Sequence, residues 1–306
     1  METGRERMPI PPESPAVGPR VGYLGPEGTF SEEALLASAG EDAVEPVALP
    51  TIYDTVIALR AGELGWAIVP IENSLEGSIS LTLDLLAEDG ADVKIVAEAV
   101  LGVSHSLIAA EMIPLERIDT VITHPQVPGQ CTRLLHGELA HAQILPASST
   151  AEAVRGVMRE QRAGLAALGT QLAARIYGAT VIRAGVQDRE DNETRFVWLA
   201  RAQDAEAPPP LRVDGGREWK TSLVFWGLGA ERPGWLVRCL DEFAQREINL
   251  TKIESRPRRE RLGSYMFFAD LAARLQEPRV AEALAGLRGM CEEVRVLGTY
   301  PAAPRA

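Results

Sequence analysis

The feature that most constrains the fold is a change in the predicted order of strands and helices across one proline-rich segment. Residues 201–217, RAQDAEAPPPLRVDGGR, hold three consecutive prolines and a glycine pair between two apolar-rich stretches. This composition is typical of a semi-rigid linker. We therefore predict a disordered tail over 1–20, a first domain over 21–203, a linker over 204–218 and a second domain over 219–301.

Before the linker, short apolar runs alternate with helical patterns, which indicates an α/β domain. Two of the predicted helices cover residues 129–139 and 150–160. A long extended stretch at 93–110 lies between two such groups, and a final strand follows at 194–200. Two lobes joined by crossing strands explain this order, as in periplasmic solute-binding proteins, with a cleft between the lobes as the ligand site. We place lobe 1 at about 21–100 with 186–203, and lobe 2 at about 101–185.

After the linker the predicted order becomes strand, helix, strand, strand, helix, strand, which is the ferredoxin-like βαββαβ unit. Its small sheet is expected to be half-exposed and to pair with a copy of itself, giving a homodimer or homotetramer. The six predicted elements cover residues 221–228, 234–248, 250–256, 264–272, 279–290 and 293–300.

Composition excludes several classes of protein. The net charge of −12 makes a broad surface for nucleic-acid phosphates improbable. Cys131, Cys239 and Cys291 form no CxxC pair or disulfide framework, which suits a reducing compartment. No apolar window is long enough for a membrane span, and the N-terminus lacks the apolar core of a signal peptide. We expect a cytoplasmic protein.

Polar groups and glycine follow the predicted strands at three helix starts, 25–31, 70–77 and 147–151. Each of them alone is also compatible with an ordinary capped helix. Together they favour a site for a small organic polyanion, because helix N-termini supply a positive field through oriented N–H groups. Gly28 is expected to let the backbone approach this ligand.

Further polar groups lie at 123–126, 130–131 and 191–196. Within the last of these, Arg195 is the expected bidentate partner of a ligand carboxylate.

The histidines do not form a metal-ligand cluster in the sequence, and we predict no metal site. We interpret His124 and Cys131 as a positioning histidine and a buried cysteine, in preference to a nucleophilic pair. His105, His136 and His141 are expected to be surface residues or satisfied core residues.

Several motifs resemble, in order and spacing, those of prephenate dehydratase fused to a regulatory ACT domain, over residues 21–301. They are GPEGTFSEEA at 25–34, PIENSLEG at 70–77, THPQVPGQC at 123–131, ASST at 147–150 and NETRF at 192–196, followed in the second domain by INLTKIESRP at 248–257 and VLGTYP at 296–301.

The resemblance implies conversion of prephenate to phenylpyruvate, with loss of carbon dioxide and water and without a metal or other cofactor. It assigns the acid to Thr194, as donor or relay, and a neighbouring catalytic role to Arg195. Glu72 is expected to be structural. By motif match the substrate contacts are Thr29, Ser31, Asn73, Ser74, Gln126, Gln130, Ser149, Thr150 and Phe196.

The resemblance also implies that L-phenylalanine acts as an effector, bound across two ACT domains. The implied effector residues are Gly234, Trp235, Leu236, Asn249, Leu250, Glu254, Ser255, Arg256 and Pro257.

Two positions depart from the family pattern. Trp235 stands where the family typically has alanine, and it is expected either to stack on the effector or to occupy its space. Residues 127–129, Val-Pro-Gly, replace an alanine-rich helical stretch and are expected to shift the helix start by a turn.

Two alternatives stay open from the sequence. One is arogenate dehydratase, which has the same motifs and acts on L-arogenate. The other is a non-catalytic amino-acid sensor with the same two lobes, although neither a signal peptide nor a basic helix-turn-helix is apparent. The residues before Val21 are too few for a chorismate mutase domain, so we expect a monofunctional enzyme.

Overall fold

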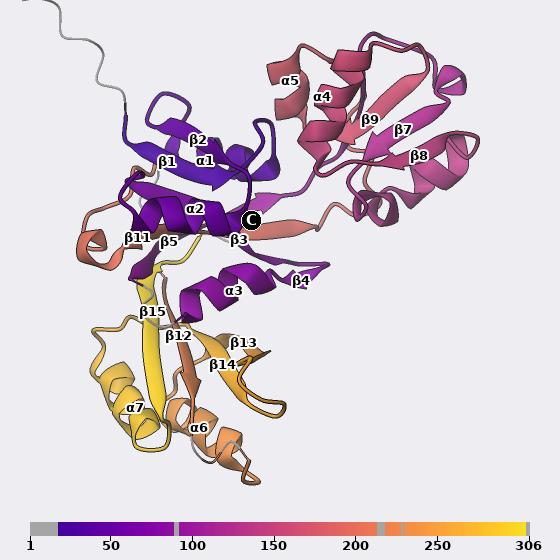
Figure 1. Cartoon of the computed structure of the whole chain (residues 1–306). Coiled ribbons are helices and arrows are strands. Elements are labelled where there is room, and N and C mark those ends of the chain that lie inside the picture. The colour runs from indigo at the N-terminus through magenta and orange to yellow at the C-terminus, as the bar shows by residue number, and fades with distance from the viewer. Residues whose placement is uncertain (1–17, 89–91, 213–217, 228, 230, 304–306) are drawn as a thin grey trace, which may run out of the picture.

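The computed structural model describes residues 18–88, 92–212, 218–227, 229 and 231–303. Most of the predicted tail and residues 213–217 of the predicted linker lie outside these ranges. The chain forms two lobes and a second domain, and lobe 1 lies between the other two bodies (Figure 1). Within the described ranges, no helix is both long and apolar enough to cross a bilayer.

Lobe 1 is built on a sheet with the strand order β2-β1-β3-β11-β5, in which β4 pairs with β3. Helix α1 packs on one face of this sheet, and α2 and α3 pack on the other. The elements are β1 (Arg20–Leu24), α1 (Phe30–Ala39), β2 (Glu45–Leu49), α2 (Ile52–Arg60), β3 (Trp66–Asn73), β4 (Gly77–Ser78), α3 (Ser80–Ala87), β5 (Val93–Gly102) and β11 (Glu193–Arg201).

Lobe 2 has the strand order β10-β6-β9-β7-β8. The chain enters it between β5 and β6 and returns between β10 and β11, so two segments connect the lobes. The elements are β6 (Ser106–Ala109), β7 (Thr120–Thr123), β8 (Gln143–Pro146), α4 (Thr150–Glu160), β9 (Leu165–Gly169), α5 (Gln171–Tyr177) and β10 (Thr180–Arg183).

In place of the regular helix predicted over 129–139, the chain forms short irregular helical turns. A 3₁₀ turn over Val127–Gln130 and a π-helical turn over Leu134–Glu138 occupy this stretch. Pro128 and two glycines within it disfavour a regular α-helix, because proline lacks a backbone donor and glycine has low helix propensity.

The second domain is a four-stranded antiparallel sheet with the order β13-β14-β12-β15. Helices α6 and α7 cover one face, where Phe225, Phe243 and Leu284 are buried. The elements are β12 (Trp219–Trp226), α6 (Trp235–Ala244), β13 (Leu250–Pro257), β14 (Tyr265–Leu271), α7 (Pro278–Arg288) and β15 (Glu293–Pro301).

The other face of this sheet is not open, so the predicted half-exposed sheet is wrong. Val224, Phe268 and Tyr300 from that face share one continuous hydrophobic core with Ile71 and Val197 of lobe 1. The reason lies in the strands themselves: residues 221–226 are buried on both sides, which demands a packing partner on each. Lobe 1 is that partner.

Candidate active site

Thr194 and Asn73 pair with each other at the ends of two neighbouring strands, β11 and β3. The Asn73 Nδ2 group donates a hydrogen bond of 2.9 Å to Thr194 Oγ1. Because Thr194 Oγ1 accepts this bond, its own O–H proton stays available for a ligand. Thr194 is 9% exposed, so this proton lies in a largely water-excluded place.

The turn after β3 fixes the orientation of the Asn73 amide. Its Oδ1 accepts hydrogen bonds of 2.9 Å from the backbone N–H groups of Leu75 and Glu76. Since a backbone N–H can only donate, Oδ1 must face the turn and Nδ2 must face Thr194. Gly77, with φ +82°, continues this turn into β4.

A chain of side chains continues from Asn73 into the junction of the two lobes. Asn73 Nδ2 also donates to Asn192 Oδ1 at 2.8 Å, and Asn192 Nδ2 donates to Gln130 Oε1 at 3.1 Å. His105 Nε2 lies 3.0 Å from the same Gln130 oxygen. Burial lowers the pKa of His105, which keeps its ring neutral.

Neither Asn192 nor His105 was predicted to be a site residue, and His105 was expected to be a surface residue or a satisfied core residue. Asn192 lies within the NETRF motif, two residues before Thr194, and that proximity was its signal. His105 carried no local signal, because its partner Gln130 is distant in sequence.

Two other predicted substrate residues lie beside Asn73. Ser74 Oγ accepts a hydrogen bond of 3.0 Å from the Glu193 backbone N–H. Gln126 Nε2 donates to Glu76 Oε2 at 3.3 Å. Together with Gln130, these residues surround one end of β11.

The remaining predicted contacts make no hydrogen bond to Asn73 or Thr194 in the described part of the chain. Thr29 Oγ1 donates to the Leu24 carbonyl at 2.9 Å, and Ser149 caps α4 by accepting from Glu152 N at 3.0 Å. Phe196 is fully buried in the core beneath α1, which contradicts its assignment as a substrate contact. Ser31 and Thr150 are both buried in the first turn of their helices.

Arg195 requires a correction, because its guanidinium binds carboxylates of the protein. Consecutive residues of a strand point to opposite faces, so Arg195 faces away from the side of Thr194. Its Nη1 lies 2.8 Å from Asp270 Oδ2 and 3.1 Å from Glu98 Oε2, and its Nη2 lies 3.2 Å from Glu72 Oε2. Burial opposes its charge, but these carboxylates outweigh burial and raise the pKa of Arg195.

Two lysines complete the group. Lys220 Nζ lies 2.8 Å from Glu98 Oε1, and Lys252 Nζ lies 3.1 Å from Glu72 Oε1. We call Glu72, Glu98, Arg195, Lys220, Lys252 and Asp270 the interdomain cluster. It joins lobe 1 to the second domain, and Glu72 and Arg195 directly adjoin Asn73 and Thr194 in the chain.

Gly28 also requires a correction. Its φ is +85°, and a Cβ there would lie 2.8 Å from Ala173 of α5. Its carbonyl accepts a hydrogen bond of 2.6 Å from Thr170, and its N–H donates to Glu32 Oε2 at 2.5 Å. The glycine therefore permits close contact between the two lobes. Its N–H group is already bonded to the Glu32 carboxylate.

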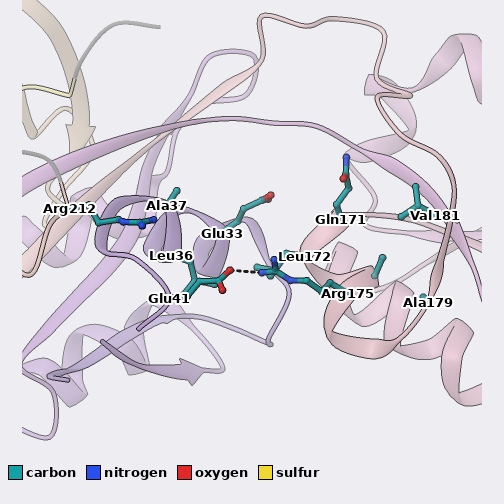
Figure 2. Close-up of a pocket in the computed structure, with 11 residues that line it drawn as sticks. Glu33, Leu36, Ala37, Glu41, Gln171, Leu172, Arg175, Ala179, Val181 and Arg212 are labelled. Atoms are coloured by element: carbon teal, nitrogen blue, oxygen red, sulfur yellow. Dashed lines mark hydrogen bonds and ion pairs between the residues drawn. The ribbon is translucent and has the colours of Figure 1, made fainter. Parts of the chain in front are cut away.

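A groove between the lobes lies around the end of α1 and around α5 (Figure 2). Glu33 and Glu41 line it from lobe 1, Arg175 from lobe 2, and Arg212 from the segment that leads to the second domain. Arg175 Nη2 and Glu41 Oε1 are 2.8 Å apart across it (Figure 2). The groove is not lined by Thr194 or by the residues hydrogen-bonded in succession to it, Asn73, Asn192, Gln130 and His105.

Trp235, an expected effector residue, belongs to the core of the second domain. It is 4% exposed, and its indole N–H donates to the Met290 carbonyl at 3.0 Å. Its ring lies 6.2 Å from that of Phe225 and 5.9 Å from that of Phe267. The indole therefore packs within the core of its own domain, and its relation to an effector stays a prediction.

The other expected effector residues divide between several surroundings. Glu254 accepts a hydrogen bond of 2.9 Å from Ser78, and Arg256 lies 2.9 Å from Asp84 of α3, so both face lobe 1. Asn249 lines a cavity between lobe 1 and the second domain, which Arg195 and Lys220 also line. Gly234 precedes α6 with φ +78°, Leu236 and Leu250 pack against the core, and Ser255 and Pro257 are exposed.

The described residues hold no candidate metal cluster, and Cys131 is not placed as a nucleophile. No cluster of three or more His, Cys, Asp or Glu suited to a metal ion occurs there. Cys131 is fully buried in lobe 2, and burial raises the pKa of its thiol to about 12. Its interpretation as a buried cysteine is confirmed.

Comparison with known proteins gives concordant results. Residues 21–204 match the family model described as prephenate dehydratase. A prephenate dehydratase of Mycolicibacterium vanbaalenii is 40% identical over 298 residues, covering 92% of this chain and 91% of the relative.

Solved structures are also similar. That of an Arthrobacter aurescens prephenate dehydratase in complex with L-Phe has a TM-score of 0.81 and 33% identity, covering 94% of this chain and 92% of the other. GqqA, described as a novel type of quorum quenching acylase, has a TM-score of 0.78 and 26% identity, covering 93% and 98%.

Proposed function

The chain belongs to the prephenate dehydratase family, and on that premise we propose that Thr194 is the hydrogen-bond donor on which its reaction depends. The reaction is the decarboxylating dehydration of prephenate to phenylpyruvate. The bond to the ring carboxylate breaks and releases carbon dioxide, and its electron pair enters the ring. The ring C–O bond breaks as the ring becomes aromatic, and the departing oxygen must gain a proton to leave as water.

The hydrogen bond from Asn73 to Thr194 carries this proposal. A threonine hydroxyl is a weak acid, so its contribution depends on its direction and on the exclusion of water. Asn73 Nδ2 occupies a lone pair of Thr194 Oγ1 at 2.9 Å and leaves the O–H to donate. Such a donor stabilises the charge that develops on the departing oxygen.

The same bond argues against acyl transfer, the activity named for one structural neighbour. A hydroxyl nucleophile needs a neighbouring base that takes its proton. The partner of Thr194 is an amide nitrogen that donates, and a donating amide cannot act as that base.

We infer that the two substrate carboxylates are bound at the junction of the lobes without Arg195. The half-buried Gln130, the exposed Gln126 and Ser74 supply polar groups there. The N-termini of α1, at Phe30, and of α4, at Thr150, supply oriented N–H groups, which favour anions even in a chain of negative net charge. Arg195 is already occupied by three protein carboxylates.

We further infer that the second domain is an ACT domain through which L-phenylalanine regulates a homo-oligomer. Its βαββαβ order and the L-Phe complex of the Arthrobacter aurescens enzyme support this. The interdomain cluster supplies a physical link, because Arg195 of β11 contacts Asp270 of β14. A change in the second domain therefore reaches the strand that carries Thr194.

The decisive experiment assays the purified chain with prephenate and with L-arogenate side by side, following phenylpyruvate and phenylalanine as products. Turnover of prephenate, its loss in Thr194→Ala and its inhibition by L-phenylalanine are expected. Preferred turnover of L-arogenate would identify the other dehydratase. Turnover of neither substrate by a folded protein would contradict a catalytic function.

A further inference from the structure

His105 ends a hydrogen-bonded chain that starts at the proposed donor, Thr194. The chain runs through Asn73, Asn192 and Gln130, with donor–acceptor distances between 2.8 and 3.1 Å. It begins in lobe 1, passes a connecting segment at Asn192, and reaches lobe 2 at Gln130. His105 lies on the other connecting segment, directly before β6.

The direction of every bond in this chain follows from the backbone. Leu75 N–H and Glu76 N–H fix Asn73 Oδ1, so Asn73 Nδ2 must donate to Asn192 Oδ1. The Asn192 amide then presents Nδ2 to Gln130, whose facing atom must be the acceptor Oε1. The His105 nitrogen that meets this oxygen must therefore carry the proton.

The surroundings of His105 hold it in this neutral Nε2–H form. The residue is 2% exposed, and its ring packs nearly perpendicular to that of Phe30 at a centroid distance of 5.5 Å. Its backbone N–H donates to Gln187 Oε1 at 3.0 Å. Its Nδ1 is buried and has no hydrogen-bond partner in the described part of the chain, so a proton there would be left unpaired.

We propose that His105 is a positioning residue for the dehydration, holding the Gln130 amide so that its Nε2 group can donate to a substrate beside Thr194. Two donors, from His105 and Asn192, meet at Gln130 Oε1. A flipped Gln130 amide would place its own N–H groups against both of them. His105 thereby turns the Gln130 Nε2 protons away from the hydrogen-bonded chain. Gln130 is left as a donor toward a substrate, next to Thr194, whose direction Asn73 sets.

The inference rests on the proposed role of Thr194 and is tested with His105→Leu, His105→Gln and Thr194→Ala in the full-length chain. Leucine removes the donor, whereas glutamine offers an amide N–H in place of Nε2–H. His141→Gln is the control, because His141 is exposed and lies outside the chain of hydrogen bonds. The measurements are kcat, KM and the melting temperature of each variant.

We expect His105→Leu to lower kcat about tenfold or more with little change in KM, because a misdirected donor loses most in the transition state. His105→Gln should recover most of this loss, and His141→Gln should match the wild type. In a Gln130→Leu background, His105→Leu should add almost nothing, since residues that act as a unit are not additive.

Unchanged kcat in a folded His105→Leu variant, or full additivity with Gln130→Leu, would overturn the proposal. If the leucine variant does not fold, the glutamine variant decides. A folded glutamine variant that loses kcat as severely as Gln130→Leu contradicts the role, and one that keeps it supports the role. Activity of Thr194→Ala near the wild type would instead show that the proposed function of Thr194 is wrong.

Discussion

Arg195 Nη1 and Asp270 Oδ2 lie 2.8 Å apart across the boundary between lobe 1 and the second domain. Arg195 follows Thr194 on β11, and the strand alternation sends the two side chains to opposite faces. Glu72 and Asn73 on β3 repeat this arrangement, with Glu72 in the interdomain cluster and Asn73 bonded to Thr194. The two strands thus carry the candidate site on one face and the contact with the second domain on the other.

Thr194→Ala is expected to lower kcat about 100- to 1,000-fold, the usual effect of removing one well-placed donor. Thr194→Ser should retain more activity, because it keeps the hydroxyl that Asn73 orients. Steady-state kinetics with prephenate, accompanied by circular dichroism, measure this. An alanine variant with near wild-type turnover contradicts the assignment.

Arg195→Met is expected to destabilise the protein by about 3–5 kcal/mol, because it leaves buried carboxylates without their partner. Arg183→Met is the matched control: Arg183 pairs with Glu138 at the surface, where such a pair is worth about 0–1 kcal/mol. Urea unfolding in the absence of substrate gives both values. Unchanged stability together with lost turnover would instead support a role of Arg195 in binding a substrate carboxylate.

Trp235→Ala is expected to cost about 3–5 kcal/mol, as for other large-to-small changes in a core. The loss is expected because the indole is buried and its N–H group donates to the Met290 carbonyl. Val237→Ala on the same helix is the control, since Val237 is 69% exposed. Equal urea midpoints for the two variants would show that the indole contributes nothing to the core.

Deletion of residues 205–306 is expected to yield a first domain that melts lower and aggregates. The deletion exposes the apolar face of lobe 1 that contacts Val224, Phe268 and Tyr300. Light scattering and thermal melts of the truncated and full-length chains measure the difference. A monomeric truncated protein with an unchanged melt would show that the two domains fold independently.

The free energy of unfolding should also depend on pH through the titration of His105. Its pKa is lowered in the folded state, so below the ordinary value of about 6.5 the unfolded chain takes up the proton first. The groups that face the ring, Phe30 and Gln130, carry no charge.

The stability contribution of neutral His105 is therefore present above about pH 6.5 and is lost as the pH falls through its lowered pKa. The stability of the wild type relative to His105→Gln should decrease as the pH is lowered from about 7 to 5. A pH-independent difference in urea unfolding would show that the ring does not titrate in this way.

The sequence by itself determined the features that depend on neighbours along the chain. The helix predicted over 150–160 has the bounds that the structure gives to α4, because apolar spacing and the Ser149 cap are local signals. The positions of Asn73 and Thr194 at strand ends followed in the same way. Where proline and glycine oppose a helical pattern, at 128–137, local signals conflicted, and short irregular helical turns formed in place of the predicted regular helix.

Only the tertiary structure decided which partners each side chain meets. Arg195 carried the charge to bind a substrate carboxylate, but strand pairing placed it among Glu72, Glu98 and Asp270, which are far from it in the sequence. Gly28 met α5 in place of a ligand for the same reason. Periodicity shows which face of a strand is apolar, whereas the surface that covers this face is set by the packing of distant segments against one another.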